Sequence, residues 1–542
     1  MSPSATFDTT STGHSNRLKI LVPEKVSPDG LALLTPHFDV DNRKGLTAPE
    51  LINLIPDYHG LIIRSETQVT AEVVQAGRKL RVVARAGVGV DNIDVPAASA
   101  QGVIVVNSPS GNILAAAEHT IALLLSTARN VGQADSSVKA GRWERSKLVG
   151  VEVGRKTLGI IGLGKVGMNV ARMAIGLGMA VKAVDPYAST DMARQTGVEL
   201  VPGLEDLLPV VDFLTIHTPL LATTLDLVGE AEFKKMKKTA RVLNVARGEP
   251  LAPDSAAARL SQHPKVVATP HLGASTVEAQ ENVSMDVCKQ VLEILHGGLP
   301  TSAVNAPIIM PEEYRKLQPS VQLVEKMGRL YTQHFVRSKG GMIGGRRFEL
   351  TYHGDLAGMT NTKPLFAALV KGLVSTFSDS HINMVNAALI AKEKGIVISE
   401  TRSGDSPSTY ANLVTLRSYQ AGSSGSEQVI EGYASDERVF ISKLDRFNGV
   451  FTPEGTLIIL HNYDEPGKIG GVGMVLGQHG INIKFMQVAS LDPEATKGAD
   501  TPPDPKGNEA LMILGVLGPV SGEVLEDLNN SPGVLDVGLV KL

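Results

Sequence analysis

A glycine-rich segment offers the clearest chemistry in the chain. Residues Gly162–Gly167 read Gly-Leu-Gly-Lys-Val-Gly, between an apolar strand-like run and a helix-like run. Alone the pattern is weak, but in this context it is typical of a loop that binds a pyrophosphate. Gly162 permits a tight turn, Gly164 lets the backbone approach the phosphates, and Gly167 allows close packing of helix on strand. The helix N-terminus adds N–H donors and positive potential.

Asp185 ends the next predicted strand, 18 residues after Gly167. A carboxylate there accepts hydrogen bonds from a ribose diol and repels a 2′-phosphate, which favours NAD over NADP. The alternative is a glycine turn beside an Asp-Pro turn with no ligand. The order strand, loop, helix, strand, Asp favours the nucleotide.

His271 and Arg247 each follow a predicted strand. Oxidation of a hydroxy acid needs a base for the hydroxyl proton and a cation for the carboxylate. In open α/β sheets, ligands bind at the carboxyl ends of strands. A lone His or Arg is more often structural, but two at strand ends downstream of a dinucleotide loop favour a catalytic pair.

The elements that must position these residues alternate between strands and helices, which predicts an α/β fold with mostly parallel sheets. A helix is predicted over 113–130 with Asn112 as its N-cap, and further helices at Pro49–Ile55 and Ala71–Ala76. The predicted strands are Leu18–Val22, Gly60–Ile63, Arg81–Ala84, Val103–Val106, Thr157–Gly162, Ala180–Asp185, Phe213–His217, Arg241–Ala246 and Lys265–Pro270.

The last part of the chain has a different pattern. Residues 311–335 predict a helix, 345–450 mix strands and helices, and 456–542 follow the order β-α-β-β-α-β, which is ferredoxin-like. The polar stretch Pro493–Asn508 is predicted to be a flexible insert, and residues 1–16 a disordered tail.

Size and composition narrow the class of protein. A chain of 542 residues suggests about three or four domains. A net charge of −4 without a basic block argues against nucleic acid and anionic membranes. The sequence contains no run of about 18 apolar residues, so no membrane span is predicted. No cluster of metal ligands is expected. The single cysteine, Cys288, excludes an intramolecular disulfide and suggests a reducing, cytoplasmic location.

Several motifs together resemble the D-2-hydroxyacid dehydrogenases, and within them the phosphoglycerate dehydrogenase family. They are Arg64-Ser65-Glu66-Thr67, the run Arg85–Asn92, Asn107-Ser108-Pro109, Ala117–Thr120, Gly162–Gly167, Ala246-Arg247-Gly248 and Thr269-Pro270-His271. The resemblance implies two Rossmann-like doubly wound domains, then an α+β intervening domain and a ferredoxin-like ACT domain. The implied bounds are 17–110 with 277–310 for substrate, 111–276 for NAD, 311–452 for the intervening domain and 453–542 for the ACT domain.

The resemblance also implies a reaction and residue roles. The reaction is NAD-dependent oxidation of 3-phosphoglycerate to 3-phosphohydroxypyruvate in serine synthesis. His271 is the implied acid/base, Glu249 its partner, and Arg247 the carboxylate or carbonyl ligand. Arg64 faces the substrate phosphate, and the backbone at Val88 and Gly89 cradles the carboxylate. The implied NAD contacts are Gly162, Gly164, Lys165, Val166, Gly167, Asp185, His217, Thr218, Pro219 and Ala246. Trp143, Arg145 and Lys147 resemble an arm that crosses to a partner subunit, within a homotetramer.

The chain departs from the family beside Arg247. The family's Glu-Pro dipeptide matches Glu249-Pro250, only two residues later, whereas in the family a helix and a strand intervene. Nothing between Gly248 and Lys265 is strand-like. A missing strand leaves a gap of roughly 4.8 Å in a sheet, so we expect a void or a shift of the His271 strand, and impaired or absent turnover.

Two questions stay open from the sequence. ACT domains bind small amino acids, usually serine in this family, and Asn462, Asp464 and Asn482 are the matching positions. The alternative is a polar turn that only caps a helix.

The activity of the chain has alternatives too. A second interpretation is a different 2-hydroxyacid dehydrogenase, which acts on glyoxylate or hydroxypyruvate. A third reading, from a different class, is a non-catalytic protein that binds NAD or an amino acid.

Overall fold

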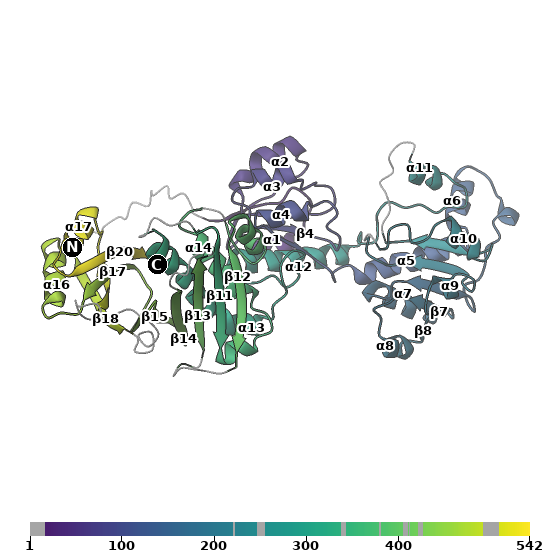
Figure 1. Cartoon of the computed structure of the whole chain (residues 1–542). Coiled ribbons are helices and arrows are strands. Elements are labelled where there is room, and N and C mark those ends of the chain that lie inside the picture. Colours follow the sequence, from purple (N-terminus) through teal and green to yellow (C-terminus); the bar gives the residue numbers. More distant parts are fainter. Residues whose placement is uncertain are drawn as a thin grey trace, which may run out of the picture. The chain divides into compact units, whose positions relative to one another are not determined.

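The computed structural model describes residues 17–220, 223–246, 255–337, 343–378, 381–404, 410, 412–420, 427–491 and 509–542. The chain divides into two compact units, and Figure 1 labels helices and strands of the whole chain. The first holds residues 1–68, 83–93 and 106–296, and the second holds 69–82, 94–105 and 297–542. The predicted N-terminal tail and the insert at Pro493–Asn508 lie outside the described residues.

The N-terminal strands form a five-stranded sheet in the order β2-β1-β3-β4-β5. Its strands are β1 (Lys19–Leu21), β2 (Asp39–Asp41), β3 (Gly60–Ile63), β4 (Val82–Arg85) and β5 (Ile104–Asn107). The helices among them are α1 (Pro28–Leu34), α2 (Ala48–Leu54), η1 (Ile55–Asp57), α3 (Ala71–Ala76) and α4 (Val95–Ala100). All four residues of β3 are buried, as expected for a strand covered on both faces. The alternation predicted from the sequence is confirmed here.

The second sheet carries the glycine loop and is parallel, in the order β10-β9-β6-β7-β8. Its strands are β6 (Thr157–Ile161), β7 (Ala180–Val184), β8 (Val198–Leu200), β9 (Phe213–Ile216) and β10 (Arg241–Asn244). The helices are α5 (Ile113–Ala128), α6 (Val131–Lys139), η2 (Arg145–Lys147), α7 (Lys165–Gly176), α8 (Thr190–Gln195), α9 (Leu204–Leu207), α10 (Glu230–Lys235), α11 (Ala256–Ser261) and α12 (Val277–Leu295). Order reverses on either side of β6, the arrangement of a doubly wound, Rossmann-like fold.

One prediction in this region is wrong. Residues 265–270 form no strand, and 268–270 are exposed. Within the described residues β10 is the edge of its sheet. The segment pairs with no strand among the described residues and so is not part of the sheet, while the void expected beside it stays a prediction. Asn112 is the N-cap of α5, as predicted, although its side chain makes no capping hydrogen bond.

The remaining strands form one ten-stranded sheet, in the order β12-β11-β13-β14-β15-β16-β18-β19-β17-β20. They are β11 (Arg346–His353), β12 (Val397–Ser403), β13 (Leu413–Gln420), β14 (Gln428–Ser435), β15 (Arg438–Leu444), β16 (Phe447–Phe451), β17 (Thr456–Tyr463), β18 (Asn482–Leu491), β19 (Glu509–Leu517) and β20 (Val534–Lys541). The helices are α13 (Pro311–Tyr331), η3 (Thr332–Arg337), η4 (Gly354–Gly358), α14 (Lys363–Val374), α15 (Ala387–Glu393), α16 (Lys468–Gln478) and α17 (Gly522–Asn529). The predicted β-α-β-β-α-β order of the last part is confirmed.

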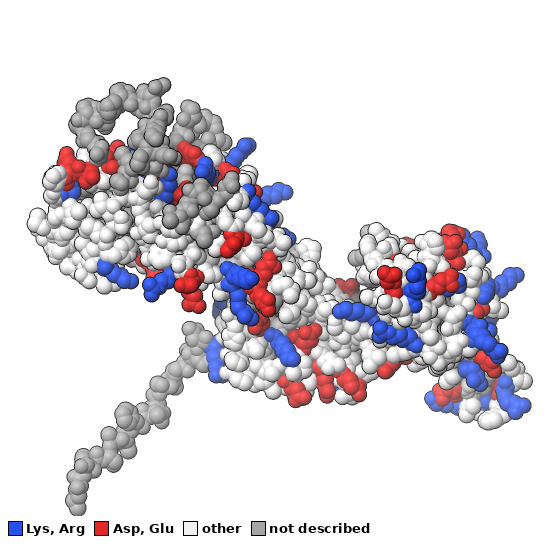
Figure 2. All heavy atoms as spheres, turned by 90° about the horizontal axis from the view of Figure 1, so that it is seen from below, with Lys and Arg blue, Asp and Glu red and all other residues white. Residues whose placement is uncertain are grey.

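Two features are absent from the described residues, a helix that could span a membrane and a cluster of metal ligands. None of their helices combines the length and apolarity needed to cross a bilayer. They contain no group of three or more His, Cys, Asp or Glu placed to hold a metal ion. Figure 2 shows Lys and Arg interspersed with Asp and Glu on the face that it presents.

Candidate active site

The glycine loop has the geometry that its sequence requires. β6 ends at Ile161, and Gly162 takes φ +92°, a left-handed conformation that suits glycine. A Cβ on Gly162 would lie 2.8 Å from the carbonyl oxygen of His217, and one on Gly167 would overlap the carbonyl oxygen of Gly162. Gly164 is the N-cap of α7 and has no atom within 4 Å of a Cβ built on it. That open side, in front of the helix N-terminus, is a cradle that fits a pyrophosphate.

Asp185 follows β7 directly and is bonded to the glycine loop. Its Oδ2 accepts a hydrogen bond from the backbone N–H of Leu163 at 2.7 Å, and its Oδ1 accepts one from Tyr187 N–H at 2.8 Å. The side chain is half-buried. Its carboxylate therefore lies beside the loop, as a ribose ligand must in this fold.

The end of β9 lies against the same loop. His217 Nε2 and Thr215 Oγ1 are 3.1 Å apart, and burial lowers the pKa of His217 to about 4. The ring is therefore neutral at neutral pH. A Cβ on Gly162 would also lie 3.0 Å from Thr218 Cγ2, so the loop passes close to Thr218. Pro219, the next residue, is exposed.

Three other predicted NAD contacts lie around this loop. Lys165, the first residue of α7, donates from Nζ to Ser110 Oγ at 3.0 Å. Val166 is half-buried and packs against the core of this sheet. Ala246, beyond β10, donates its N–H to Asn244 Oδ1 at 3.1 Å.

The predicted substrate residues lie on two loops at the carboxyl end of the N-terminal sheet. Arg64 follows β3, and Val88 and Gly89 follow β4. Arg85 joins these loops, because its Nε donates to Arg64 O at 3.2 Å and its Nη1 donates to Gly89 O. Asn107 Nδ2 donates to Val88 O at 2.5 Å. This linking role of Arg85 could not be predicted from the sequence, because spacing along the chain does not show which carbonyl a side chain reaches.

The predicted catalytic residues are less fully described. Arg247 and Glu249 lie outside the described residues. His271 is exposed and follows the segment that forms no strand. One contact ties that segment to α5: His119 Nε2 and Thr269 Oγ1 are 3.3 Å apart. His119 belongs to a motif quoted above, but its spacing gave no reason to pair it with Thr269.

The predicted effector residues lie around the start of α16 and of β18. Asn462 is in β17, Asp464 follows that strand, and Asn482 begins β18. Asn462 is buried, with Nδ2 donating to Tyr463 O at 2.9 Å and Oδ1 lacking a partner among the described residues. Asp464 and Asn482 are exposed. The buried position of Asn462 was not visible from its neighbours in sequence.

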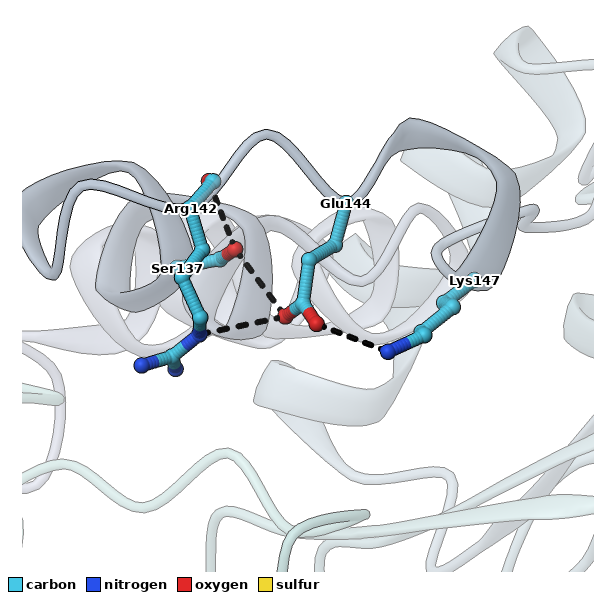
Figure 3. Close-up of polar contacts among 4 residues, drawn as sticks. All are labelled: Ser137, Arg142, Glu144 and Lys147. Atoms are coloured by element: carbon cyan, nitrogen blue, oxygen red, sulfur yellow. Dashed lines mark hydrogen bonds and ion pairs between the residues drawn. The ribbon is translucent and has the colours of Figure 1, made fainter.

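The predicted arm is organised by Glu144 (Figure 3). Its Oε1 accepts from Lys147 Nζ at 2.9 Å, and its Oε2 accepts from Ser137 Oγ at 3.2 Å and Arg142 Nε at 3.5 Å. The bond from Lys147, followed by that from Ser137, lowers the pKa of Glu144. Trp143, between Arg142 and Glu144, is 84% exposed. Arg145 and Lys147 form η2.

Comparison with known proteins identifies the family. Residues 121–260 match the NAD binding domain of D-isomer specific 2-hydroxyacid dehydrogenases, and residues 316–437 match the D-3-phosphoglycerate dehydrogenase intervening domain. The chain is 37% identical to a D-3-phosphoglycerate dehydrogenase of Synechocystis over 97% of its length and 95% of the relative's. It is 39% identical to the chloroplastic D-3-phosphoglycerate dehydrogenase 3 of Arabidopsis thaliana, covering 96% and 92%.

A solved structure of NAD-bound 3-phosphoglycerate dehydrogenase from Entamoeba histolytica is 26% identical, covers 54% of this chain and all of that one, and has a TM-score of 0.46. That likeness carries no part of the assignment, which depends on the matched domains and the full-length relatives. The chain therefore belongs to the D-3-phosphoglycerate dehydrogenase family, the NAD-dependent dehydrogenases of D-2-hydroxy acids.

Proposed function

We propose that this chain oxidises 3-phosphoglycerate at its hydroxyl carbon to 3-phosphohydroxypyruvate, the reaction named for its relatives. The observation that carries the proposal is the glycine loop, with open space at Gly164 and the Asp185 carboxylate bonded beside it. NAD, when bound, supplies the hydride acceptor. The loop, the first turn of α7 and Asp185 would hold its pyrophosphate and ribose.

The remaining residues would bind the substrate and move its proton. His271 would accept the hydroxyl proton as the carbon is oxidised, with Glu249 stabilising its charged form. Arg247 and the backbone N–H groups of Val88 and Gly89 would hold the carboxylate. Arg64 would hold the phosphate through charge-assisted hydrogen bonds, which distinguishes a phosphorylated acid from glyoxylate.

We propose low turnover for the chain as its sequence stands. Among the described residues, 265–270 pair with no strand, and His271 after them is exposed, so the sheet does not position the base against the nicotinamide. A misplacement of about 1 Å can cost on the order of a hundredfold in rate. The alignment of this chain with the D-3-phosphoglycerate dehydrogenase of Archaeoglobus fulgidus is 553 positions long, whereas this chain has 542 residues. That relative therefore has residues without counterparts in this chain.

One set of assays separates the three readings. NADH formation is measured with 3-phosphoglycerate, NADH consumption with glyoxylate and hydroxypyruvate, and NADH binding by calorimetry. The proposal predicts NADH binding and slow turnover that is fastest with the phosphorylated acid. Faster turnover of glyoxylate would support the other dehydrogenase, and binding with no turnover of any acid would support a non-catalytic homologue.

We propose the domain division expected from the resemblance, with the substrate domain at 17–110 and 277–310 and the NAD domain at 111–276. The intervening domain at 311–452 is supported by the match over 316–437. The ACT domain at 453–542 is supported by the β-α-β-β-α-β order. We also propose serine as an effector, bound by Asp464 and Asn482 on the exposed side and tested by calorimetry with serine, with alanine as the control.

We propose a homotetramer in which the Trp143 arm contacts a partner. Support comes from the exposure of Trp143 and of Val131, Val138 and Val149, which lie near it in the sequence, since exposed apolar side chains mark interaction sites where they gather. Trp143 is the chain's one tryptophan, so its emission reports this contact directly. We expect a blue-shifted emission that moves red on dilution, and an unshifted, concentration-independent spectrum would reject the arm contact. We propose a cytoplasmic location from the single cysteine.

A further inference from the structure

Glu24 is a buried carboxylate at the end of the sheet where the substrate loops lie. It follows β1 and is 6% exposed. Its Oε1 accepts hydrogen bonds from the backbone N–H groups of Arg64 and Thr67, each at 2.9 Å. Its Oε2 accepts one from Glu66 N–H at 3.2 Å. The carboxylate thus binds the main chain of one short loop, residues 64–67, at three points.

The opposite edge of the same loop is bound through its carbonyl groups. Asn92 Nδ2 donates to Arg64 O at 2.9 Å and to Thr67 O at 2.6 Å. Arg85 Nε donates to Arg64 O at 3.2 Å. Arg64 and Thr67 therefore have both their N–H and their C=O fixed, although the loop is neither helix nor strand. Such a loop has no ladder of its own, so these side chains determine its conformation.

Charge and length make a glutamate suited to this position. A buried carboxylate needs hydrogen-bond donors around it, and three amide N–H groups supply them. An amide in its place has one oxygen, and its NH₂ group would face an N–H donor. An aspartate is shorter by one C–C bond, about 1.5 Å, and would draw the loop inward.

We propose that Glu24 is a positioning residue, which aims the Arg64 side chain at the phosphate of the substrate and so sets the preference for a phosphorylated hydroxy acid. The inference deepens the proposed function and rests on it. The backbone sets where the arginine side chain begins and which of its first rotamers are allowed, and Glu24 holds the N–H of that residue. Arg85 donates to Arg64 O and also to Gly89 O. It therefore connects the loop at 64–67, proposed to bind the phosphate, with the loop at Val88 and Gly89, proposed to bind the carboxylate.

The test is Glu24→Gln, which keeps the shape and removes the charge. Its matched control is Glu72→Gln, at an exposed position of α3 outside the loop. Calorimetry measures 3-phosphoglycerate and unphosphorylated D-glycerate, each added to protein saturated with NADH, and NADH alone. We expect Glu24→Gln to weaken 3-phosphoglycerate binding roughly 10- to 100-fold and to change NADH and D-glycerate binding less than about threefold. Glu72→Gln should match the wild type on all three ligands.

A double variant distinguishes positioning from general damage. Arg64→Ala removes the side chain that Glu24 is proposed to aim, so adding Glu24→Gln to it should cost no further affinity for 3-phosphoglycerate. Equal losses in both backgrounds, or equal losses for D-glycerate, would overturn the positioning role. Glu24→Asp provides a charged second variant if Glu24→Gln does not fold, and should also lose affinity for the phosphorylated ligand alone.

The result with the wild type separates this inference from the proposed function. A wild type that binds NADH but not 3-phosphoglycerate would overturn the proposed substrate, and the role of Glu24 with it. Equal affinity of the wild type and of Glu24→Gln for 3-phosphoglycerate would overturn only the role of Glu24, and would leave the proposed substrate in place.

Discussion

Substituting Gly164 by alanine separates cofactor binding from folding. A Cβ at this position meets no atom within 4 Å, and the backbone φ of −71° is accessible to alanine. The new methyl group would therefore occupy only the open cradle in front of α7. Loss of the glycine N-cap should destabilise the helix by about 0.5–1 kcal/mol.

The expected loss of NADH affinity follows from the bonds that the methyl group displaces. We expect the methyl group to move the pyrophosphate away from two N–H donors of the first turn. Each charge-assisted bond lost in this way costs roughly 1.5–3 kcal/mol of binding free energy. The sum, about 3–6 kcal/mol, corresponds to an increase in the dissociation constant of roughly 10²- to 10⁴-fold. The loss of binding therefore exceeds the loss of stability by several kcal/mol.

The assay is NADH fluorescence titration beside thermal unfolding, with two reference variants. Gly176→Ala, at the other end of α7, also meets no atom within 4 Å, and should bind NADH normally and stabilise the helix by up to about 1 kcal/mol. Gly167→Ala would press against the Gly162 carbonyl, and should lose both stability and affinity. Normal NADH affinity in Gly164→Ala would refute the assignment of this loop to the pyrophosphate.

Other predictions concern the strand, the ribose site and pH. The corresponding helix–strand unit of the Archaeoglobus fulgidus relative, about 30 residues, can be inserted after Gly248. The insertion should raise the rate of NADH production on the order of a hundredfold. Equal turnover with and without it would reject the role of the missing strand. Asp185→Ala removes the acceptor of Leu163 N–H and should weaken NADH binding about tenfold while leaving NADPH binding less affected, as fluorescence titration would show. The pKa of His217 falls from 6.5 to about 4 on folding, so the unfolded chain binds more protons between these values and stability drops as pH falls through this window. Urea unfolding at pH 7 and at pH 5 should show roughly 2 kcal/mol of this loss in the wild type and not in His217→Gln.

The glycine loop and its flanking strands could be predicted because their signals are local. Gly162 needs its left-handed φ, and Gly167 its contact with the Gly162 carbonyl, whatever the rest of the fold does. Alternating apolar runs likewise placed β6, β7, β9 and β10 to within about two residues of their bounds.

The roles of Glu24 and Asn462 could not be predicted in this way. Glu24 lies 40 residues from Arg64 in sequence, and only the pairing of β1 with β3 brings the two together. Asn462 is in a strand between β19 and β20, and the pleat alone decides that its side chain is buried. From the sequence alone, a polar residue in either place is predicted to lie in a turn or at the surface. Only its neighbours in space show that it is buried.

The error at 265–270 shows what periodicity leaves out. The run Val266-Val267-Ala268-Thr269 has the composition of a strand, yet 268–270 are exposed and the segment pairs with nothing among the described residues. A strand is stable only when a partner in register takes up its backbone N–H and C=O groups. The edge strand β10 has an exposed residue, Val242, at 38%, which an added strand and its helix would cover. Restoring that unit should therefore do two things at once: bury the edge of the sheet, and supply the partner that draws residues 265–270 into it with His271 at their carboxyl end. Turnover that rises without a gain in stability would mean that the two effects are separate, and that the base is positioned by something other than the sheet.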